Sequence, residues 1–406
     1  MQPSNPVHAI APHAPASARG VFATLLPITL AVFVGFLAIG AVLPVLPVHI
    51  HHDLGLSAVV VGVVAGAQFA AALLTRAWAG GLADTRGSKR AVTLGAWVSA
   101  AAGGTYLLST LALGQPAVAA AVLLAGRVLQ GCAESLIVTG ALSWGVGLVG
   151  PQNAGKVMAW VGIAMYGAYA IGAPLGAHVQ GAHQFAGVAV LSTVLPLLAW
   201  LVIAPVRPVA ITNVKRVPFY RVIGSVWLPG LGLALSSAGF GLLTAFVPLL
   251  FADHGWAGPA LAFTWFGVAF VGARLVFGHL PDKIGGAQVA LACVLIEAAG
   301  LALVWQAGSA DWVHAGAALI GFGYSLAFPG FGVEAVRRAP PQSRGVAMGA
   351  YVAFLDLSLG IVNPGAGAIA KGWGIDSVFF CGALAAAVAA LVALRLLWTR
   401  VRPQVG

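Results

Sequence analysis

Long apolar runs of the sequence, where charged side chains are rare, contain the ionisable residues Arg127, Glu134 and Asp356. Asp356 lies about halfway along the apolar run 343–370, and Arg127 and Glu134 share the run 117–148. A charge at the centre of a membrane helix costs about 3 kcal/mol even on a lenient insertion scale, so such residues are expected to face a bundle interior or a water-filled cavity. A carboxyl group in that position, reached by water from alternating sides, can bind a proton and release it. We therefore predict that Asp356 and Glu134 carry protons.

Arg127 and Glu134 are seven residues apart (134 − 127), which places them on one face of a helix, two turns apart. We expect them to share a polar cavity in which Arg127 adjusts the proton affinity of the carboxyl groups. Other roles stay open: Arg127 could join two helices by binding a carboxylate or carbonyl elsewhere, and Asp356 could be a hydrogen-bonded structural residue. Glu297, in another apolar run, is predicted to be neutral and hydrogen-bonded.

The composition identifies the elements that must position these residues. Of 406 residues, 60% are hydrophobic and 7% are charged, and the mean hydropathy is +0.97. Soluble domains carry about 25% charged residues, so an all-α integral membrane protein is expected. Apolar runs of about twenty residues predict twelve transmembrane helices at 21–48, 57–80, 91–113, 117–148, 155–178, 185–205, 221–251, 259–281, 288–307, 312–336, 343–370 and 374–398.

A charged motif occurs twice and divides the chain. Its first copy has Arg76, Gly80, Asp84 and Gly87, and its second copy has Arg274, Gly278, Asp282 and Gly285, each displaced by 198 residues (274 − 76). Farther along each half, Met158 and Pro174 recur at Met348 and Pro364, displaced by 190 residues (348 − 158), and in this register Tyr166 corresponds to Asp356.

A repeat that holds several membrane-length runs is typical of a transporter built from two parallel bundles. We predict six helices in each bundle, joined by a linker rich in Pro and basic residues. The expected divisions are a disordered tail at 1–20, a first bundle at 21–205, a linker at 206–220, a second bundle at 221–398 and a tail at 399–406.

The basic residues predict an orientation. Most of the 20 Lys and Arg residues fall in the tails and in the loops that would share their side of the membrane. The positive-inside rule therefore places both termini in the cytoplasm, and the formal net charge of +10 needs no nucleic-acid partner. We predict a multi-pass protein of the bacterial inner membrane that works as a monomer.

Neither the cysteines nor the histidines predict a metal site, and no cofactor is expected. Cys132, Cys293 and Cys381 lie in apolar runs without metal-ligand spacing, so they are interpreted as packing residues. The segment His49–Asp53 has metal-ligand side chains but no second cluster to complete a site. It is predicted to be a solvated loop.

The first copy of the charged motif resembles the signature loop between the second and third helices of the major facilitator superfamily, and the likeness extends over about residues 21–398. This resemblance implies a gating role for the motif. Asp84 would meet the start of the eleventh helix near Ser343, where a helix dipole favours an anion, and Asp282 would mirror it near Asn153. The candidate gating residues are Arg76, Gly80, Asp84, Arg86, Gly87, Lys89, Arg90, Arg274, Gly278, Asp282 and Gly285.

Two further motifs resemble branches of the same family. Arg127, Gln130 and Gly131 resemble a pattern of proton-coupled members, and the end of the fifth span resembles the drug and proton antiporters. Small residues and Pro there predict a kinked helix that packs closely across the interface between the halves. These packing residues are Gly167, Gly172, Pro174 and Gly176, with Pro364 in the second half. Within the family the chain looks most like an uncharacterised bacterial group loosely called arabinose efflux permeases.

We therefore predict a secondary transporter, not an enzyme, that exports a small organic or amphipathic solute in exchange for protons. No Gly-x4-Gly-Lys nucleotide loop appears. One alternative is a proton symporter importing a sugar or organic acid, for which a second mid-depth arginine besides Arg127 is expected when the solute is an anion. Another is a non-transporting membrane sensor or scaffold. Candidate cavity aromatics are Phe36, Tyr166, Tyr169, Phe240, Trp265, Phe328 and Tyr351.

Overall fold

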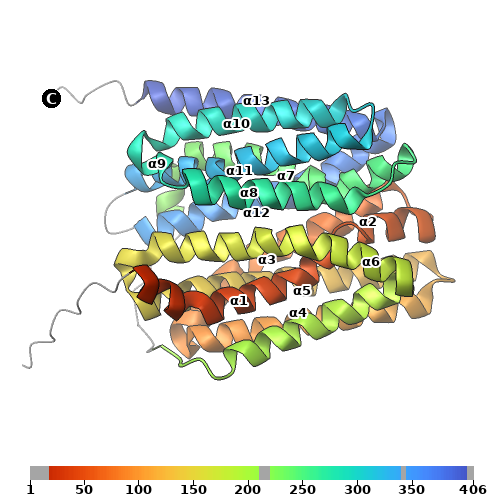
Figure 1. The fold of residues 1–406 in the computed structure, drawn as a ribbon, viewed down its shortest axis with the longest axis horizontal. Helices are drawn as coiled ribbons and strands as arrows, with labels where there is room; N and C mark the ends of the chain where they lie inside the picture. Colours follow the sequence, from red (N-terminus) through yellow and green to blue (C-terminus); the bar gives the residue numbers. More distant parts are fainter. Residues whose placement is uncertain (1–17, 210–219, 340–343, 400–406) are drawn as a thin grey trace, which may run out of the picture.

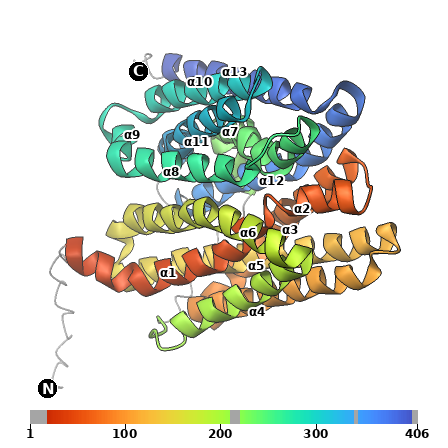
Figure 2. The same cartoon turned by 45° about the vertical axis from the view of Figure 1, so that its right-hand side comes forward.

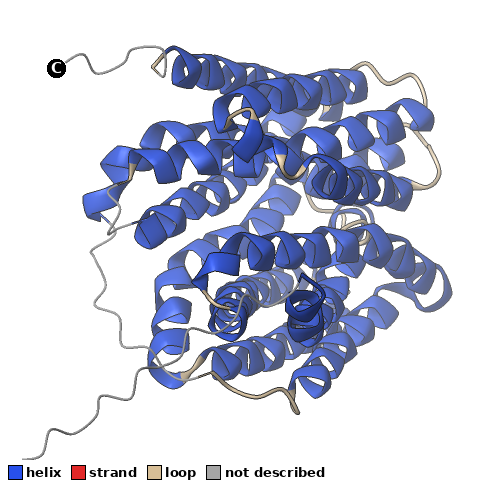
Figure 3. Cartoon of the chain, turned by 60° about the vertical axis from the view of Figure 1, so that its left-hand side comes forward, coloured by secondary structure: helices blue, strands red, loops and turns tan. Residues whose placement is uncertain are grey.

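The computed structural model describes residues 18–209, 220–339 and 344–399, and within these ranges the chain is helical without a strand (Figure 3). The predicted tails and most of the predicted linker fall outside the described residues. The first helix begins at Ala18, slightly before the expected end of the N-terminal tail. The prediction of an all-α membrane fold is confirmed.

The order of the helices follows the predicted spans. In chain order they are α1 (Ala18–Val42), α2 (Leu46–Val48), η1 (His49–Asp53), α3 (Ala58–Arg86), α4 (Ser88–Ser109), η2 (Thr110–Ala112), α5 (Pro116–Val149), η3 (Pro151–Asn153), α6 (Ala154–Ile203), α7 (Tyr220–Asp253), α8 (Pro259–Phe277), α9 (Leu280–Lys283), α10 (Gly286–Trp305), α11 (Ala310–Arg338), α12 (Arg344–Trp373) and α13 (Ile375–Trp398).

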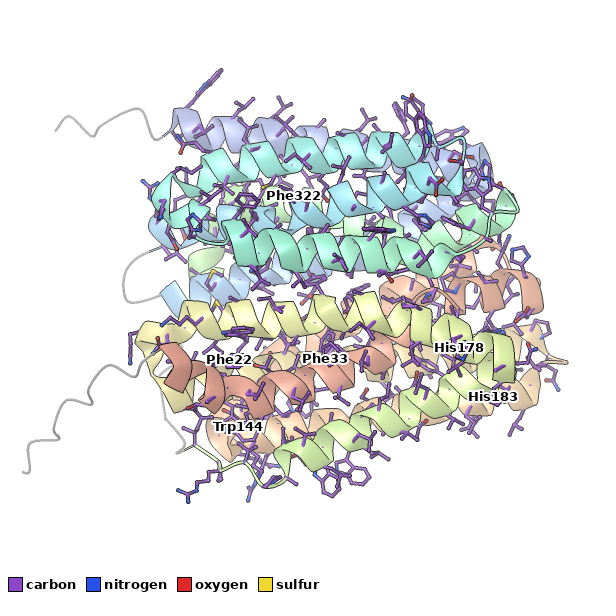
Figure 4. All side chains as sticks on the ribbon, viewed as in Figure 1. Phe22, Phe33, Trp144, His178, His183 and Phe322 are labelled. Atoms are coloured by element: carbon purple, nitrogen blue, oxygen red, sulfur yellow. The ribbon has the colours of Figure 1, made fainter. Side chains whose placement is uncertain are left out.

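Helix α6 contains two of the predicted spans. Eleven helical segments of the described chain are long and apolar enough to cross a membrane, and α6 has 50 residues, whereas one crossing needs about 20. At Gln184 the backbone leaves helical geometry, with φ 57° and ψ −168°. Figure 1 shows the yellow-green α6 turning back there, and Figure 4 places His178 and His183 beside the turn. Counted in this way, the described chain makes twelve crossings.

The helices form two groups that lie one above the other (Figures 1 and 2). Helices α1 to α6 make the lower group and α7 to α13 the upper one. The groups meet where α3 packs against α12 and where α6 packs against α8. The largest cluster of buried apolar side chains runs from Val21 to Ala386 and includes residues of both groups, so the interface between them is continuous with the protein interior.

The two ends of the molecule are named here for later use. The motif end carries the turn between α3 and α4 at residues 86–88, the start of α1 and the end of α13 (Figure 1). The far end carries the turn of α6 at Gln184 and the connection of α7 to α8 at residues 254–258.

Close contacts between the groups lie toward the far end. A Cβ added to Gly66 of α3 would lie 2.9 Å from the Pro364 side chain of α12. A Cβ added to Gly267 of α8 would lie 2.7 Å from the carbonyl oxygen of Tyr166, and Thr264 donates a hydrogen bond to the Ala170 carbonyl at 2.8 Å. Glycine at these positions lets the two groups approach at the far end.

Two local expectations need correction. Gly172 and Gly176 face the backbone of α1 around Ala41 in their own group, so their close approach does not cross the interface. The segment His49–Asp53 is a π-helical turn rather than a solvated loop. His49 is 3% exposed, and its ring stacks on Phe185 with 4.0 Å between centroids. Burial of this polar ring is tolerated because one of its nitrogens forms a hydrogen bond of 2.7 Å with Asp53.

Candidate functional site

A cavity of about 320 Å³ lies between the two groups of helices. Its walls reach Met158 and Gly349, which are exposed and lie near the starts of α6 and α12 at the motif end. The contacts at the far end close the other side. The cavity therefore opens toward the motif end. It is lined by Phe69, Arg76, Glu134, Val138, Thr139, Leu142, Met158, Val161, Gly162, Met165, Tyr166, Tyr169, Phe240, Phe270, Arg274, Tyr324, Phe328, Met348, Gly349, Val352, Leu355, Asp356 and Leu359.

Asp356 forms an ion pair across the interface between the groups. Its Oδ2 lies 2.6 Å from Nη2 of Arg76 and accepts a hydrogen bond from Nε of the same guanidinium at 2.7 Å. The Asp356 side chain is 2% exposed and that of Arg76 is 20% exposed. Arg76 therefore provides a counter-ion for a carboxylate that is otherwise cut off from water.

Glu134 reaches the same cavity from α5. Gln68 of α3 donates a hydrogen bond from Nε2 to Oε2 of Glu134 at 2.6 Å, and both residues are buried. A Cβ added to Gly131 would overlap the Gln68 carbonyl, so the missing side chain is what lets α5 lie this close to α3. The two candidate carboxyl groups thus share one cavity, each with a partner on α3.

Arg274 lines the cavity from α8. Its Nη2 donates to the Ser325 carbonyl of α11 at 2.5 Å, and its Nε donates to Oγ of Ser325 at 3.4 Å. The guanidinium also lies over the Phe270 ring, 5.2 Å from the centroid, at a distance typical of cation–π contacts. Within the part of the chain that the structure describes, the guanidinium therefore contacts a serine and an aromatic face.

An aromatic cluster lies between the charged residues and the far end. Its central residue, Tyr166, packs on Phe270 with 3.9 Å between ring centroids and donates a hydrogen bond to the Tyr324 hydroxyl at 3.3 Å. Such a surface suits a flat or apolar solute. The cluster comprises Tyr166, Tyr169, Phe240, Phe266, Phe270 and Tyr324.

The seven aromatic residues predicted from sequence to face a cavity divide into two sets. Tyr166, Tyr169, Phe240 and Phe328 line the cavity. Phe36 and Tyr351 are buried elsewhere and Trp265 is 51% exposed, so these three are not among its lining residues. Phe69, Phe270 and Tyr324 were missed because an aromatic residue in a membrane helix gives no signal of whether it faces a cavity or a neighbouring helix.

Arg127 is buried, as expected for a charge at membrane depth, but it is not among the lining residues. It lies on the helix α5 that also carries Glu134 and Gln130, and the Gln130 side chain exchanges hydrogen bonds with Ser99 of α4 at 3.1 and 3.2 Å. The expectation that Arg127 shares the cavity with Glu134 is therefore wrong: Glu134 lines the cavity and Arg127 does not. Glu297 of α10 is fully buried and accepts a hydrogen bond from Ser236 at 2.6 Å.

The two copies of the charged motif have matching backbone geometry at one position. Gly87 precedes α4 with φ 98° and ψ 140°, and Gly285 precedes α10 with φ 114° and ψ 141°. Residues with a side chain rarely adopt such positive φ values, which explains why both copies have glycine at this position. Lys89 caps the end of α6, donating to the carbonyls of Ala204 at 2.6 Å and Val206 at 2.7 Å.

The described residues include only some of those for which gating contacts were predicted. Ser343, the expected neighbour of Asp84, lies outside the described residues. The side-chain amide of Asn153, the expected neighbour of Asp282, donates to the Val149 carbonyl at 2.8 Å, and the contact with Asp282 stays a prediction. Gly278 ends α8, whereas its counterpart Gly80 lies inside α3, so the two copies differ in helical structure.

Twelve membrane crossings in two groups, with a cavity between them that is open toward one end, define a membrane transporter. The comparisons with known proteins give its family. The model of the Major Facilitator Superfamily matches residues 28–258 and 229–406, and the chain belongs to this family. Its members are transporters, so the chain is not an enzyme, and the sensor or scaffold alternative is set aside.

Curated relatives are similar over nearly the whole chain. An uncharacterized MFS-type transporter of Salmonella typhimurium is 44% identical over 374 residues, covering 92% of this chain and 96% of the relative. One of Pseudomonas aeruginosa is 43% identical over 387 residues, covering 95% and 96%. These relatives support the transporter class without giving a solute.

Solved structures show the same fold at low sequence identity. The nucleoside transporter NupG has a TM-score of 0.74 at 12% identity, covering 92% of this chain and 99% of its own. The human organic anion transporter MFSD10 has a TM-score of 0.66 at 15% identity, with the same coverage. At these identities the likeness concerns the fold alone.

Proposed function

We propose that this transporter exports a small organic or amphipathic solute in exchange for protons, by alternating access. The observation that carries the proposal is the pair of buried carboxyl groups, Asp356 and Glu134, in the wall of one cavity between the two groups of helices. Each group has a hydrogen-bonding partner that could stabilise its charged form. A proton arriving at Asp356 would weaken its ion pair with Arg76 and so link protonation to the interface.

Movement would follow from the distribution of contacts. The close packing of Gly66 and Gly267 lies toward the far end, and the cavity opens toward the motif end. Rocking of the two bundles, residues 21–205 and 221–398, about the cavity would separate the far-end contacts and close the motif end. In this scheme the motif residues, including Asp84 and Asp282, hold the motif end closed when the cavity faces the opposite side.

The same proposal gives an orientation and a setting. The motif end carries Arg86, Lys89 and Arg90, and by the positive-inside rule it would face the cytoplasm. The start of α1 and the end of α13 lie at that end. We propose a monomer in the bacterial inner membrane with cytoplasmic termini.

A second candidate is a proton symporter that imports an organic acid. It is favoured by one observation, because Arg76 and Arg274 both line the cavity. The sequence indicated Arg127 as the only deep arginine, and the structure adds two that are able to face a solute. The two candidates differ in the direction in which the solute moves relative to the proton: opposite to it in the exporter and with it in the importer.

The test is proton flux in proteoliposomes with an acidic lumen and a panel of lipophilic cations, sugars and organic acids. We expect a compound in the panel to dissipate the gradient, and Asp356→Asn to abolish that response. Asp376→Asn is the matched control, because this carboxylate is 42% exposed and lies at the far end. A transport rate that changes neither with the proton gradient nor with Asp356→Asn would show that the proton mechanism is wrong.

A further inference from the structure

Arg274 has no carboxylate partner among the described residues, although it lies in the cavity wall. Its hydrogen bonds go to Ser325, and its plane lies over the ring of Phe270. A guanidinium offers five N–H donors in a planar fork that matches a carboxylate. Most of these donors remain for a molecule in the cavity.

The internal repeat shows which partner is missing. Arg274 corresponds to Arg76, and Tyr166 corresponds to Asp356. In one combination of helices, α3 with α12, the arginine meets a carboxylate at 2.6 Å. In the equivalent combination, α8 with α6, the arginine lies over Phe270, and Tyr166 packs on that same ring at 3.9 Å between centroids. Tyr166 therefore occupies the place of the carboxylate without supplying its charge.

The other carboxyl groups of the cavity do not compensate Arg274. Asp356 is paired with Arg76 and Glu134 accepts from Gln68, so both are engaged at α3. Two uncharged tyrosines, Tyr166 and Tyr324, line the cavity together with Arg274. A charge at this depth is costly without an opposite charge, which makes the α8 wall suited to an anion.

We propose that Arg274 binds the carboxylate of an organic anion whose apolar or aromatic body lies against the aromatic cluster. The inference rests on the proposed function, because it takes this cavity as the transport site, and it names the chemical class of the solute. The cavity, at about 320 Å³, has the size of a small-molecule site. Phe270 and Tyr166 would contact the body while Arg274 holds the head group.

Binding can be measured apart from transport. The full-length protein in lipid nanodiscs is dialysed against naphthoate, naphthalenemethanol or naphthylmethylammonium, which share one ring system and differ in head-group charge. We expect naphthoate to bind at least tenfold more tightly than the alcohol, a difference of about 1.4 kcal/mol, and the ammonium to bind most weakly. Arg274→Gln should reduce naphthoate affinity to that of the alcohol.

Two variants accompany this test. Tyr166→Asp would place a carboxylate near Arg274, as Asp356 lies beside Arg76. It is expected to remove the preference for naphthoate over the alcohol, even where loss of the Tyr166 ring weakens binding of both compounds. Arg337→Gln, whose arginine is 52% exposed and outside the cavity lining, should keep the preference. If the Arg274→Gln protein no longer binds the alcohol either, its result does not isolate the head group, and the naphthoate preference of the Tyr166→Asp protein is the deciding measurement.

The proposal is overturned if the wild-type protein binds naphthoate no better than the alcohol, or if the preference survives Arg274→Gln or Tyr166→Asp. Proton movement does not enter this readout. Selective naphthoate binding by a protein that moves no protons would contradict the proposed coupling and support the assignment of Arg274. A protein that couples solute movement to protons but shows no preference for naphthoate would support the proposed coupling and contradict the assignment of Arg274.

Discussion

Removing the ion pair between Arg76 and Asp356 by a double substitution should cost less stability than the sum of its two single substitutions. The pair joins the two groups of helices, and the two nitrogen–oxygen distances are 2.6 and 2.7 Å. Arg76→Gln would leave the Asp356 carboxylate, 2% exposed, without its counter-ion. Asp356→Asn would leave an arginine that still reaches the cavity with 20% of its side chain exposed.

These exposures set the expected magnitudes. Removing one partner of a buried ion pair costs about 3–5 kcal/mol, and we expect Arg76→Gln to fall in this range. Asp356→Asn should cost less, about 1–3 kcal/mol, because the remaining charge keeps some contact with water. The double substitution leaves two neutral amides and should cost less than Arg76→Gln alone. The coupling free energy between the two residues is then about 2–3 kcal/mol.

The assay is a double-mutant cycle on the free energy of unfolding, measured by SDS titration in mixed micelles and followed by helical circular dichroism. Arg337→Gln is the control, because Glu334 keeps a second partner, Arg338, at 2.9 Å, and it should cost no more than about 1 kcal/mol. A coupling free energy below about 0.5 kcal/mol, typical of exposed pairs, would refute the view that this pair is an isolated buried contact between the halves.

Three further changes test other parts of the structure. Glu134→Gln should abolish gradient-driven transport but leave solute exchange across liposomes, with stability changed by less than about 1 kcal/mol; unchanged gradient-driven transport would contradict a coupling role. Gly66→Ala should cost about 1–3 kcal/mol in the same unfolding assay because its Cβ meets Pro364, whereas Gly104→Ala, with open space around it, should cost nothing. Lys89→Gln should cost about 1 kcal/mol through its lost bonds to the end of α6; no change would show that this cap is not needed.

The fold was predictable because a membrane leaves the chain few choices. In lipid every backbone polar group needs an internal partner, so an apolar run of sufficient length becomes a helix. The ends of helices were less predictable. The expected second span stops at residue 80, whereas α3 continues to Arg86, because polar residues end the apolar run without ending the helix. This placed Arg76 near a span end and hid its position in the cavity.

The carboxyl groups of the site were found from sequence, but their partners were not. Asp356 and Glu134 stand out because ionisable residues are rare in membrane helices. Gln68 carries no charge, and Arg76 lies 280 positions from Asp356. Which faces of α3, α5 and α12 meet depends on helix rotation and on close contacts such as Gly131 with the Gln68 backbone, and no local pattern encodes these.

The repeat could have indicated the asymmetry of the cavity, had its two registers been combined. Arg76 and Arg274 correspond in one register and Asp356 and Tyr166 in the other. Only the folded chain shows that Arg76 meets Asp356, and that Arg274 and Tyr166 both pack on the ring of Phe270. An empty cavity with both arginines paired would have no cation left to recognise an anion. With neither paired, it would carry two costly unpaired charges. One internal pair and one open arginine keep the empty site tolerable, and they leave a single charge that a solute can satisfy.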